Sequence, residues 1–217
     1  DFWDARCFPL LQQVYTDLAE IRPDLQLQLQ DAWDAMQGLR EFQPLPFSVG
    51  LCTSTMNRLW QLQHALPITL MHCYPYRERV RVYVVDLGSS DGTLKWILRH
   101  CRFFMEIDLL RVFRAEEPYW HASVGKNAAH AQAEEQILVN VDGDNMIGAG
   151  FLRNVCDKFA AGDCAVAQYE LGQGTCGRIA LRRDTFWELG GYDEDAYPMG
   201  CQDTDLVLRV KMLNRGR

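Results

Sequence analysis

From Phe47 onward, apolar residues occur in two patterns: short apolar runs alternate with segments whose apolar residues lie three or four positions apart. Runs of the first kind predict strands and segments of the second kind predict helices. The expected strands cover residues 47–53, 79–86, 107–113, 136–142, 165–169 and 179–181, and the expected helices cover 57–66, 92–101, 122–135, 151–161 and 205–213. This order predicts the α/β class, with a mostly parallel central sheet flanked by helices.

The first 46 residues have a different character. Their second half places apolar residues on one face of a helix that begins near Pro23: Leu25, Leu29, Trp33, Met36 and Leu39. Residues 10–21 predict a shorter helix, and Pro44 and Pro46 end the pattern. We therefore expect an N-terminal helical extension over residues 1–46, packed on a main domain over residues 47–217.

The charge balance narrows the classes of partner. The chain has 217 residues, with 22 Lys and Arg against 29 Asp and Glu, which gives a net charge of −7. This acidity argues against nucleic acid as a partner, but a metal ion can still bridge acidic side chains and a nucleotide. No apolar run approaches the roughly 20 residues of a membrane helix, and the first residues lack the features of a signal peptide. The sequence thus predicts no transmembrane segment and a cytoplasmic location.

The eight cysteines contain no Cys-x-x-Cys pair, so a structural zinc site is not expected. Cys52, Cys101, Cys156 and Cys164 lie within apolar runs, where a free cysteine behaves as a small buried hydrophobe. Reduced cysteines and a reducing compartment are the favoured interpretation, and the absence of an Asn-x-Ser/Thr sequon agrees with it.

Two of the expected strands end in aspartate, one at Asp86 and the other at Asp142-Gly143-Asp144. Ligands of parallel sheets bind at the carboxyl ends of strands, so both ends belong to the candidate site. In extended geometry Asp142 and Asp144 point the same way, and paired carboxylates suit Mn²⁺ or Mg²⁺. A Ca²⁺ loop of the EF-hand type does not fit, because Arg153 occupies the position of its closing glutamate.

Four blocks extend this pattern: residues 52–59, residues 85–93 with Asp-x-x-Ser-x-Asp-Gly-Thr, residues 125–144 with Asp-Gly-Asp, and residues 183–205 with Gly-Gly-Tyr-Asp-Glu and Gln-Asp. In this order they resemble nucleotide-sugar-dependent glycosyltransferases of the GT-A fold, closest to the inverting family 2 group. The resemblance implies a Rossmann-like GT-A domain over residues 47–217.

The resemblance also implies roles for individual residues. Asp142 and Asp144 would hold Mn²⁺ or Mg²⁺ on the donor diphosphate, whose leaving charge the cation neutralises. Asp203 would be the general base that takes the proton of the acceptor hydroxyl. The expected nucleotide-binding residues are Thr53, Arg58, Asp86, Ser89, Asp91, Lys126, Asn127, Asp142 and Gly143. The expected acceptor-binding residues are Trp120, Gly191 and Gln202.

The chain departs from the family pattern at two places. Gln202 stands where the family usually has a glutamate, which places the base role on Asp203, with Asp205 expected at the start of the last helix. The family commonly carries more chain after this helix, often with a histidine near the metal, whereas this sequence ends at Arg217. Either the C-terminal part of the domain is absent, or the third metal contact comes from elsewhere, for example Asn145 or water.

Several of these residues also have a plain structural interpretation. Lys126 and Arg58 could be solvated, the aromatic segment 119–121 could be a core or loop anchor, and Gly190 with Gly191 could permit a turn. The five histidines have no metal-like spacing.

The sequence thus predicts a metal-dependent glycosyltransferase that moves a sugar from a UDP-sugar to an acceptor hydroxyl of a glycan, protein or small molecule, with inversion. One alternative is a catalytically inert GT-A-like binding or scaffold module, which Gln202 and the end at Arg217 favour. Another is a nucleotidyltransferase, which would need a glycine-rich basic stretch near the first strand, where residues 50–55 hold one glycine.

Overall fold

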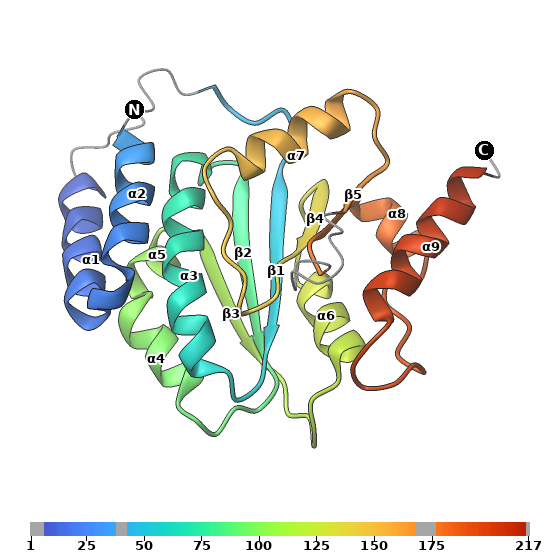
Figure 1. Cartoon of the computed structure of the whole chain (residues 1–217), viewed down its shortest axis with the longest axis horizontal. Helices are drawn as coiled ribbons and strands as arrows, with labels where there is room; N and C mark the ends of the chain where they lie inside the picture. The colour runs from blue at the N-terminus through green and yellow to red at the C-terminus, as the bar shows by residue number, and fades with distance from the viewer. Residues whose placement is uncertain (1–6, 38–42, 168–176, 216–217) are drawn as a thin grey trace.

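In the computed structural model, which describes residues 7–37, 43–167 and 177–215, a six-stranded sheet is flanked by helices on both faces (Figure 1). The strands are β1 (Val49–Thr55), β2 (Val80–Asp86), β3 (Leu110–Arg114), β4 (Ile137–Asn140), β5 (Ala165–Ala167) and β6 (Ile179–Arg182). The α-helices are α1 (Cys7–Ile21), α2 (Gln26–Gln37), α3 (Leu59–Cys73), α4 (Thr93–His100), α5 (Arg102–Glu106), α6 (Ala122–Ala131), α7 (Phe151–Ala160), α8 (Arg183–Glu188) and α9 (Gln202–Arg215). Short 3₁₀ turns cover Pro23–Leu25 and Tyr74–Tyr76.

The strand order β3-β2-β1-β4-β6-β5 confirms the predicted mostly parallel α/β sheet. β1 pairs in parallel with both β2 and β4, and β2 pairs in parallel with β3. β6 runs antiparallel to β4 and to β5. The chain therefore moves outward from β1 to β3 and then returns to the other side of β1, which creates a crevice between the carboxyl ends of β1 and β4.

The alternation of side chains along the strands divides the core into two layers. Leu51, Val84 and Val139 pack on one face of the sheet, together with apolar residues of α3 and α7. Cys52 and Leu138, their neighbours in sequence, pack on the other face with α6, α8 and α9. Both faces of the central strands are covered, so their sequences are nearly continuous apolar runs.

The two N-terminal helices pack on other helices rather than on the sheet itself: α2 packs against α3, and α1 packs against α2 and α5 (Figure 1). Leu18, Leu25 and Leu29 form a cluster with Ile68 of α3, and Trp33 joins the main core. The helix face predicted from Leu25, Leu29 and Trp33 is therefore buried. The side chain of Met36 and all of Leu39 lie outside the described residues, and the division at residue 46 stays a prediction. In the described part of the chain, no helix has both the length and the apolar character needed to cross a bilayer.

Element boundaries differ from the prediction where local pattern is a poor guide. α3 continues to Cys73, beyond the predicted end at residue 66. Leu70, Met71 and Cys73 are buried on several sides of the helix, so this part of the sequence has no amphipathic pattern that would predict a helix. α5 and α8 have five and six residues, too few to show a helical period. α9 begins at Gln202, earlier than expected, β4 ends at Asn140, and the predicted strand end at Tyr169 lies outside the described residues.

Four cysteines are buried free thiols, as a reduced protein predicts: Cys52, Cys73, Cys101 and Cys156. Cys201 is free but exposed. The expectation that Cys164 is buried is wrong, because it follows the end of α7 at the surface.

His130 on α6 is an uncommon component of the second core layer. Its ring stacks on Phe186 with a centroid distance of 4.4 Å and an interplanar angle of 14°. Its Nδ1 donates to the carbonyl of Lys126 at 2.7 Å, since a carbonyl can only accept. Burial lowers the pKa of His130 to about 4, so the ring is neutral in the folded protein at neutral pH.

This burial predicts a loss of stability in acid. The pKa of histidine in an unfolded chain is about 6.5, so protonation below that pH favours the unfolded state. The free energy of unfolding should fall by up to about 3 kcal/mol between about pH 6.5 and about pH 4 through this residue alone. His130→Phe keeps an aromatic ring against Phe186 and removes the titration. Denaturant unfolding of both proteins across this range should give the variant a clearly smaller loss, and equal losses would contradict the assignment.

Candidate functional site

A cavity of about 280 Å³ opens at the carboxyl ends of β1 and β4, between α6 and the start of α9. Its lining contains predicted site residues from distant parts of the chain: Arg58, Trp120, Lys126, Asp142, Gly143, Asp144, Gln202 and Asp203. Sequence reasoning missed five other lining residues, which are Ser54, Thr55, Gln61, Gly177 and Met199. The end of β1 at the same sheet edge was a usable signal for Ser54 and Thr55, whereas Gly177, Gln61 and Met199 carried none.

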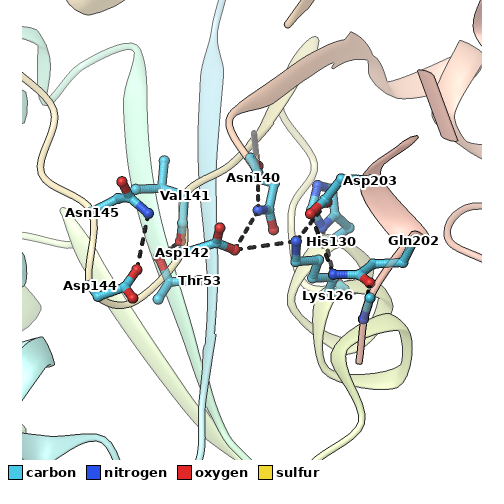
Figure 2. Close-up of polar contacts among 12 residues, drawn as sticks. Thr53, Lys126, His130, Asn140, Val141, Asp142, Asp144, Asn145, Gln202 and Asp203 are labelled. Carbon is cyan, nitrogen blue, oxygen red and sulfur yellow. Dashed lines mark hydrogen bonds and ion pairs between the residues drawn. The ribbon is translucent and has the colours of Figure 1, made fainter. Parts of the chain in front are cut away.

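Lys126 lies at the centre of the polar contacts (Figure 2). Its Nζ is 2.6 Å from Oδ1 of Asp203 and 3.2 Å from Oδ1 of Asp142. The residue is 3% exposed, and its ammonium stands 5.3 Å from the ring centroid of Tyr192. A buried ammonium needs anionic partners, and here two carboxylates provide them.

Asp203 reaches the cavity from the first turn of α9. Gly200 and Cys201, immediately before α9, have φ values of 107° and 64°, so the chain turns sharply into the helix. Burial raises the pKa of Asp203 above its ordinary value, and the Lys126 ammonium opposes that rise. Gln202 accepts from the backbone N–H of Gly200 at 2.8 Å, and its amide donates to Oδ2 of Asp203 at 3.3 Å.

Asp205 has a different environment from Asp203. Its carboxylate accepts from Nε of Arg209 at 2.8 Å, and the same guanidinium donates to the carbonyl of Leu189. Asp205 therefore lies in the first turn of α9 as the partner of an arginine one turn later, and it is not among the cavity residues.

Asp142 and Asp144 lie in a turn after β4, not in a strand. The expectation that extended geometry points them the same way is therefore wrong. Asp142 accepts from Nδ2 of Asn140 at 3.0 Å and faces Lys126, whereas Asp144 accepts from Nδ2 of Asn145 at 3.0 Å (Figure 2). Both carboxylates nevertheless line the same cavity.

Gly177 at the approach to β6 lies directly behind Asp142. A Cβ at this position would collide with the Asp142 carboxylate, so no other residue fits there without moving it. The carbonyl of Gly177 also accepts from Nδ2 of Asn140 at 2.6 Å. The glycine thus lets the β6 side of the sheet close against the turn that carries Asp142.

Three residues predicted to bind nucleotide hold the loops at this edge instead of lining the cavity. Thr53 Oγ1 donates to the carbonyl of Val141 at 2.8 Å, which ties β1 to the chain after β4. Asp86 is fully buried, and its Oδ1 accepts from the N–H of Ser89 at 3.0 Å, while its Oδ2 has no hydrogen-bond partner among the described residues. Ser89 Oγ in turn accepts from the N–H of Asn57 at 2.8 Å.

Asp91, also predicted to bind nucleotide, caps two helices. Its Oδ2 accepts from the N–H of Leu59 at 2.8 Å, at the start of α3. Its Oδ1 accepts from the N–H and the hydroxyl of Thr93, at 3.0 and 2.6 Å, at the start of α4. Both carboxylate oxygens therefore satisfy donors at helix starts.

Asn127 of α6 and Gly191 lie close together, outside the lining of the cavity. Oδ1 of Asn127 accepts from the N–H of Tyr192, and its Nδ2 donates to the carbonyl of Tyr192 and to Glu194, each at 2.8 Å. A Cβ on Gly191 would approach Asn127 Oδ1 to 2.6 Å, and the φ of Gly191 is +71°. The pair fixes the turn after α8, and neither residue lines the cavity.

The donor set of the cavity is compatible with a hard cation but incomplete by itself. Over residues 7–37, 43–167 and 177–215, no three His, Cys, Asp or Glu side chains gather in a metal-binding arrangement. Asp142 and Asp144 supply two carboxylates, so further oxygen ligands would have to come from a bound molecule or water. Oδ1 of Asn145, expected as a further ligand, accepts from Arg178 at 2.9 Å.

Comparisons with known proteins agree with this architecture. The sequence model of the family described as Glycosyl transferase family 2 matches residues 52–215, more than half of the chain. A search of characterised protein sequences gives no match.

Two solved structures resemble this fold over most of the chain. A mannosyltransferase, PcManGT from Pyrobaculum calidifontis, in complex with GDP-Man and Mn²⁺, has a TM-score of 0.64 at 20% identity over 94% of this chain. Residues 1–349 of TarS from S. aureus, in complex with UDP-GlcNAc, give a TM-score of 0.61 at 15% identity over 75% of this chain. At these identities the likeness shows the fold alone. The matches cover 64% and 52% of those two chains, so this chain is similar to a part of each.

The contacts of Asp91 predict an effect on stability. Asp91→Ala should lower the free energy of unfolding by about 1–2 kcal/mol, because the first turns of α3 and α4 lose their side-chain acceptor. Asp163→Ala, which removes an exposed aspartate between α7 and β5, serves as the control and should change stability by less than about 0.5 kcal/mol. Denaturant unfolding at neutral pH measures both, and an Asp91→Ala variant as stable as the control would contradict the capping role.

Proposed function

Because the chain belongs to glycosyl transferase family 2, as its match over residues 52–215 establishes, we propose that it transfers a sugar from a UDP-sugar to an acceptor hydroxyl with the help of Mn²⁺ or Mg²⁺. The family and the GT-A fold predicted from the sequence are thereby confirmed. The observation that carries the proposed reaction is that Asp142, Asp144 and the half-buried Asp203 line one cavity.

Asp142 and Asp144 form the donor half of this proposed site. When bound, the cation would neutralise the charge that develops on the departing nucleoside diphosphate. Two carboxylates, with the donor phosphates and water as further oxygen ligands, suit Mn²⁺ or Mg²⁺. PcManGT, which this chain resembles, was solved with GDP-Man and Mn²⁺, and that supports a divalent cation here.

The remaining proposed donor contacts come from residues that line the cavity and from one residue that is fully buried, Asp86. Arg58, Lys126 and Gly143 line the cavity, where the diphosphate would lie. We assign the nucleoside to Asp86, as the family pattern implies. Its buried Oδ2 has no hydrogen-bond partner within residues 7–37, 43–167 and 177–215, and this supports the assignment, because such an atom is costly unless a donor reaches it. Since Asp86 is fully buried, this contact would require the segment after β2 to move. Thr53, Ser89, Asp91 and Asn127 would act by fixing the loops around the donor.

Asp203 is the proposed general base. It is the carboxylate of α9 that lines the cavity, whereas the carboxylate of Asp205 is held by Arg209. If the acceptor hydroxyl approaches from the Asp203 side and the diphosphate leaves toward Asp142, attack and departure occur on opposite faces of the sugar, which gives inversion. Trp120 and Gln202 line the acceptor side, and Gly191 would contribute only through the turn it allows.

An inactive binding module is the alternative that one observation favours. Gln202 stands beside Asp203 where the family usually has glutamate, and a neutral amide cannot take a proton. Such a module would bind nucleotide without transferring sugar, so the binding and transfer experiments below separate the two functions.

The donor assignment predicts metal-dependent nucleotide binding. Wild-type protein should bind UDP more tightly with Mn²⁺ than without it, and GDP more weakly than UDP, as measured by calorimetric titration. Asp144→Ala should lose the effect of Mn²⁺, because one of the two carboxylates is gone. The exposed side chain of Asp144 makes few contacts, so the fold should be unaffected. Asp163→Ala is the matched control for the loss of one negative charge.

Equal UDP affinity with and without Mn²⁺ in the wild-type protein would refute the metal assignment. Preferential binding of GDP would instead change the nucleoside and leave the reaction class intact.

The base assignment predicts different results for two neighbouring aspartates. Asp203→Asn should reduce sugar transfer by roughly 10²–10⁴-fold without weakening UDP binding, because it removes the proton acceptor and keeps the side-chain shape. Asp205→Asn should cost much less, because it disturbs a surface pair with Arg209. Both variants are compared in one transfer assay that uses UDP-sugars and an acceptor panel. If Asp205→Asn transferred no sugar while Asp203→Asn remained active, the general base would be Asp205 and not Asp203.

A further inference from the structure

Lys126 joins the two halves of the proposed site through one ammonium group. Its Nζ contacts Asp203, assigned to the acceptor half, at 2.6 Å and Asp142, assigned to the donor half, at 3.2 Å (Figure 2). The two carboxylates come from the turn after β4 and the start of α9, so this contact links segments far apart in the sequence. This inference rests on the proposed function and adds to it a link between donor binding and the base.

The ion pair with Lys126 engages one carboxylate oxygen of the proposed base. Oδ1 of Asp203 accepts from the ammonium, and Oδ2 faces the amide of Gln202 at 3.3 Å. A carboxylate oxygen in a short bond to an ammonium is a weaker acceptor for the proton of an acceptor hydroxyl. Asp203 is also largely shielded from water, with a side chain 18% exposed, so bulk solvent does little to weaken the pair.

A bound donor changes the forces on the ammonium. A cation on Asp142 would repel Nζ, and the nearby diphosphate would attract it, since phosphate oxygens compete with carboxylates for ammonium donors. The long lysine side chain permits a shift of Nζ within the cavity without movement of α6.

We propose that Lys126 is a positioning residue that couples donor binding to the base. Without donor, its ammonium is held by Asp203 and Asp142. A bound nucleoside diphosphate draws the ammonium off Asp203, and that carboxylate becomes available to the acceptor hydroxyl only when the donor is in place.

A double-mutant cycle on UDP binding tests this coupling. UDP with Mn²⁺ is titrated by calorimetry into the wild-type chain, Asp203→Asn, Lys126→Met and the double variant, with GDP in parallel. If Asp203 and the diphosphate compete for the ammonium, Asp203→Asn should tighten UDP binding on the order of tenfold. The same change in the Lys126→Met background should alter UDP affinity less than about twofold.

Two further measurements separate coupling from a merely structural role. Lys126→Met should bind Mn²⁺ alone more tightly than the wild-type chain and UDP more weakly, because the ammonium opposes the cation and attracts the phosphates. A structural lysine would lower both affinities together. Lys126→Arg keeps the charge and should retain the tighter UDP binding caused by Asp203→Asn. Lys95→Met removes an exposed lysine of α4 away from the cavity and should leave both affinities unchanged.

The outcomes distinguish the coupling from the proposed function. If the wild-type chain binds UDP and Asp203→Asn has equal effects in both backgrounds, the coupling is wrong and the proposed function stands. If the wild-type chain binds neither UDP nor GDP, both are wrong. Should Lys126→Met fail to fold, the comparison of wild type with Asp203→Asn still decides, because unchanged or weaker UDP binding by Asp203→Asn contradicts the competition.

Discussion

The position of the site depends on one constraint, the parallel pairing of β1 with both β2 and β4. Parallel neighbours require crossover connections, so the chain leaves each of these strands at the same edge of the sheet. The residues after β4 and the end of β1 therefore meet at the point where the strand order reverses. α6, which packs across β1 and β2, brings its own polar side chain to that edge. The sheet thus assembles the cavity before any contact between polar side chains is considered.

At this edge of the sheet, the buried ammonium of Lys126 determines how the charges of the cavity are balanced. Two carboxylates face it, so this part of the site carries one negative charge more than the lysine neutralises. Arg58 and Asp144, which also line the cavity, carry opposite charges, so the lining as a whole keeps a surplus of one negative charge. A surplus of negative charge in a partly enclosed space favours a cation, and a cation in turn favours the phosphates of a donor. The negative charge of the cavity therefore agrees with the proposed binding of a divalent cation and a nucleoside diphosphate.

The sequence was informative where the signal is local. Apolar runs predicted the strands, and the aspartates at the end of β2 and after β4 indicated the sheet edge at which the cavity opens. The pairing of Lys126 with Asp203 spans 77 residues and has no local pattern, so it could not be predicted. A motif match also cannot tell a ligand contact from a structural one. Asp91 and Asn127 fit the family pattern, but their polar atoms cap helices and fix a turn, because the same acceptors serve both purposes.

The departure at Gln202 takes on a different meaning in this environment. From the sequence alone, the missing glutamate places the base role on Asp203 and also favours the alternative of an inactive module. In the structure a glutamate at 202 would put a further negative charge beside Asp203, whose pKa burial already raises. The amide instead donates to Asp203 and accepts from Gly200, which holds the sharp turn into α9 without adding like charge. A neutral residue at this position leaves Lys126 to balance Asp203 and Asp142, so the glutamine is consistent with an ionised base.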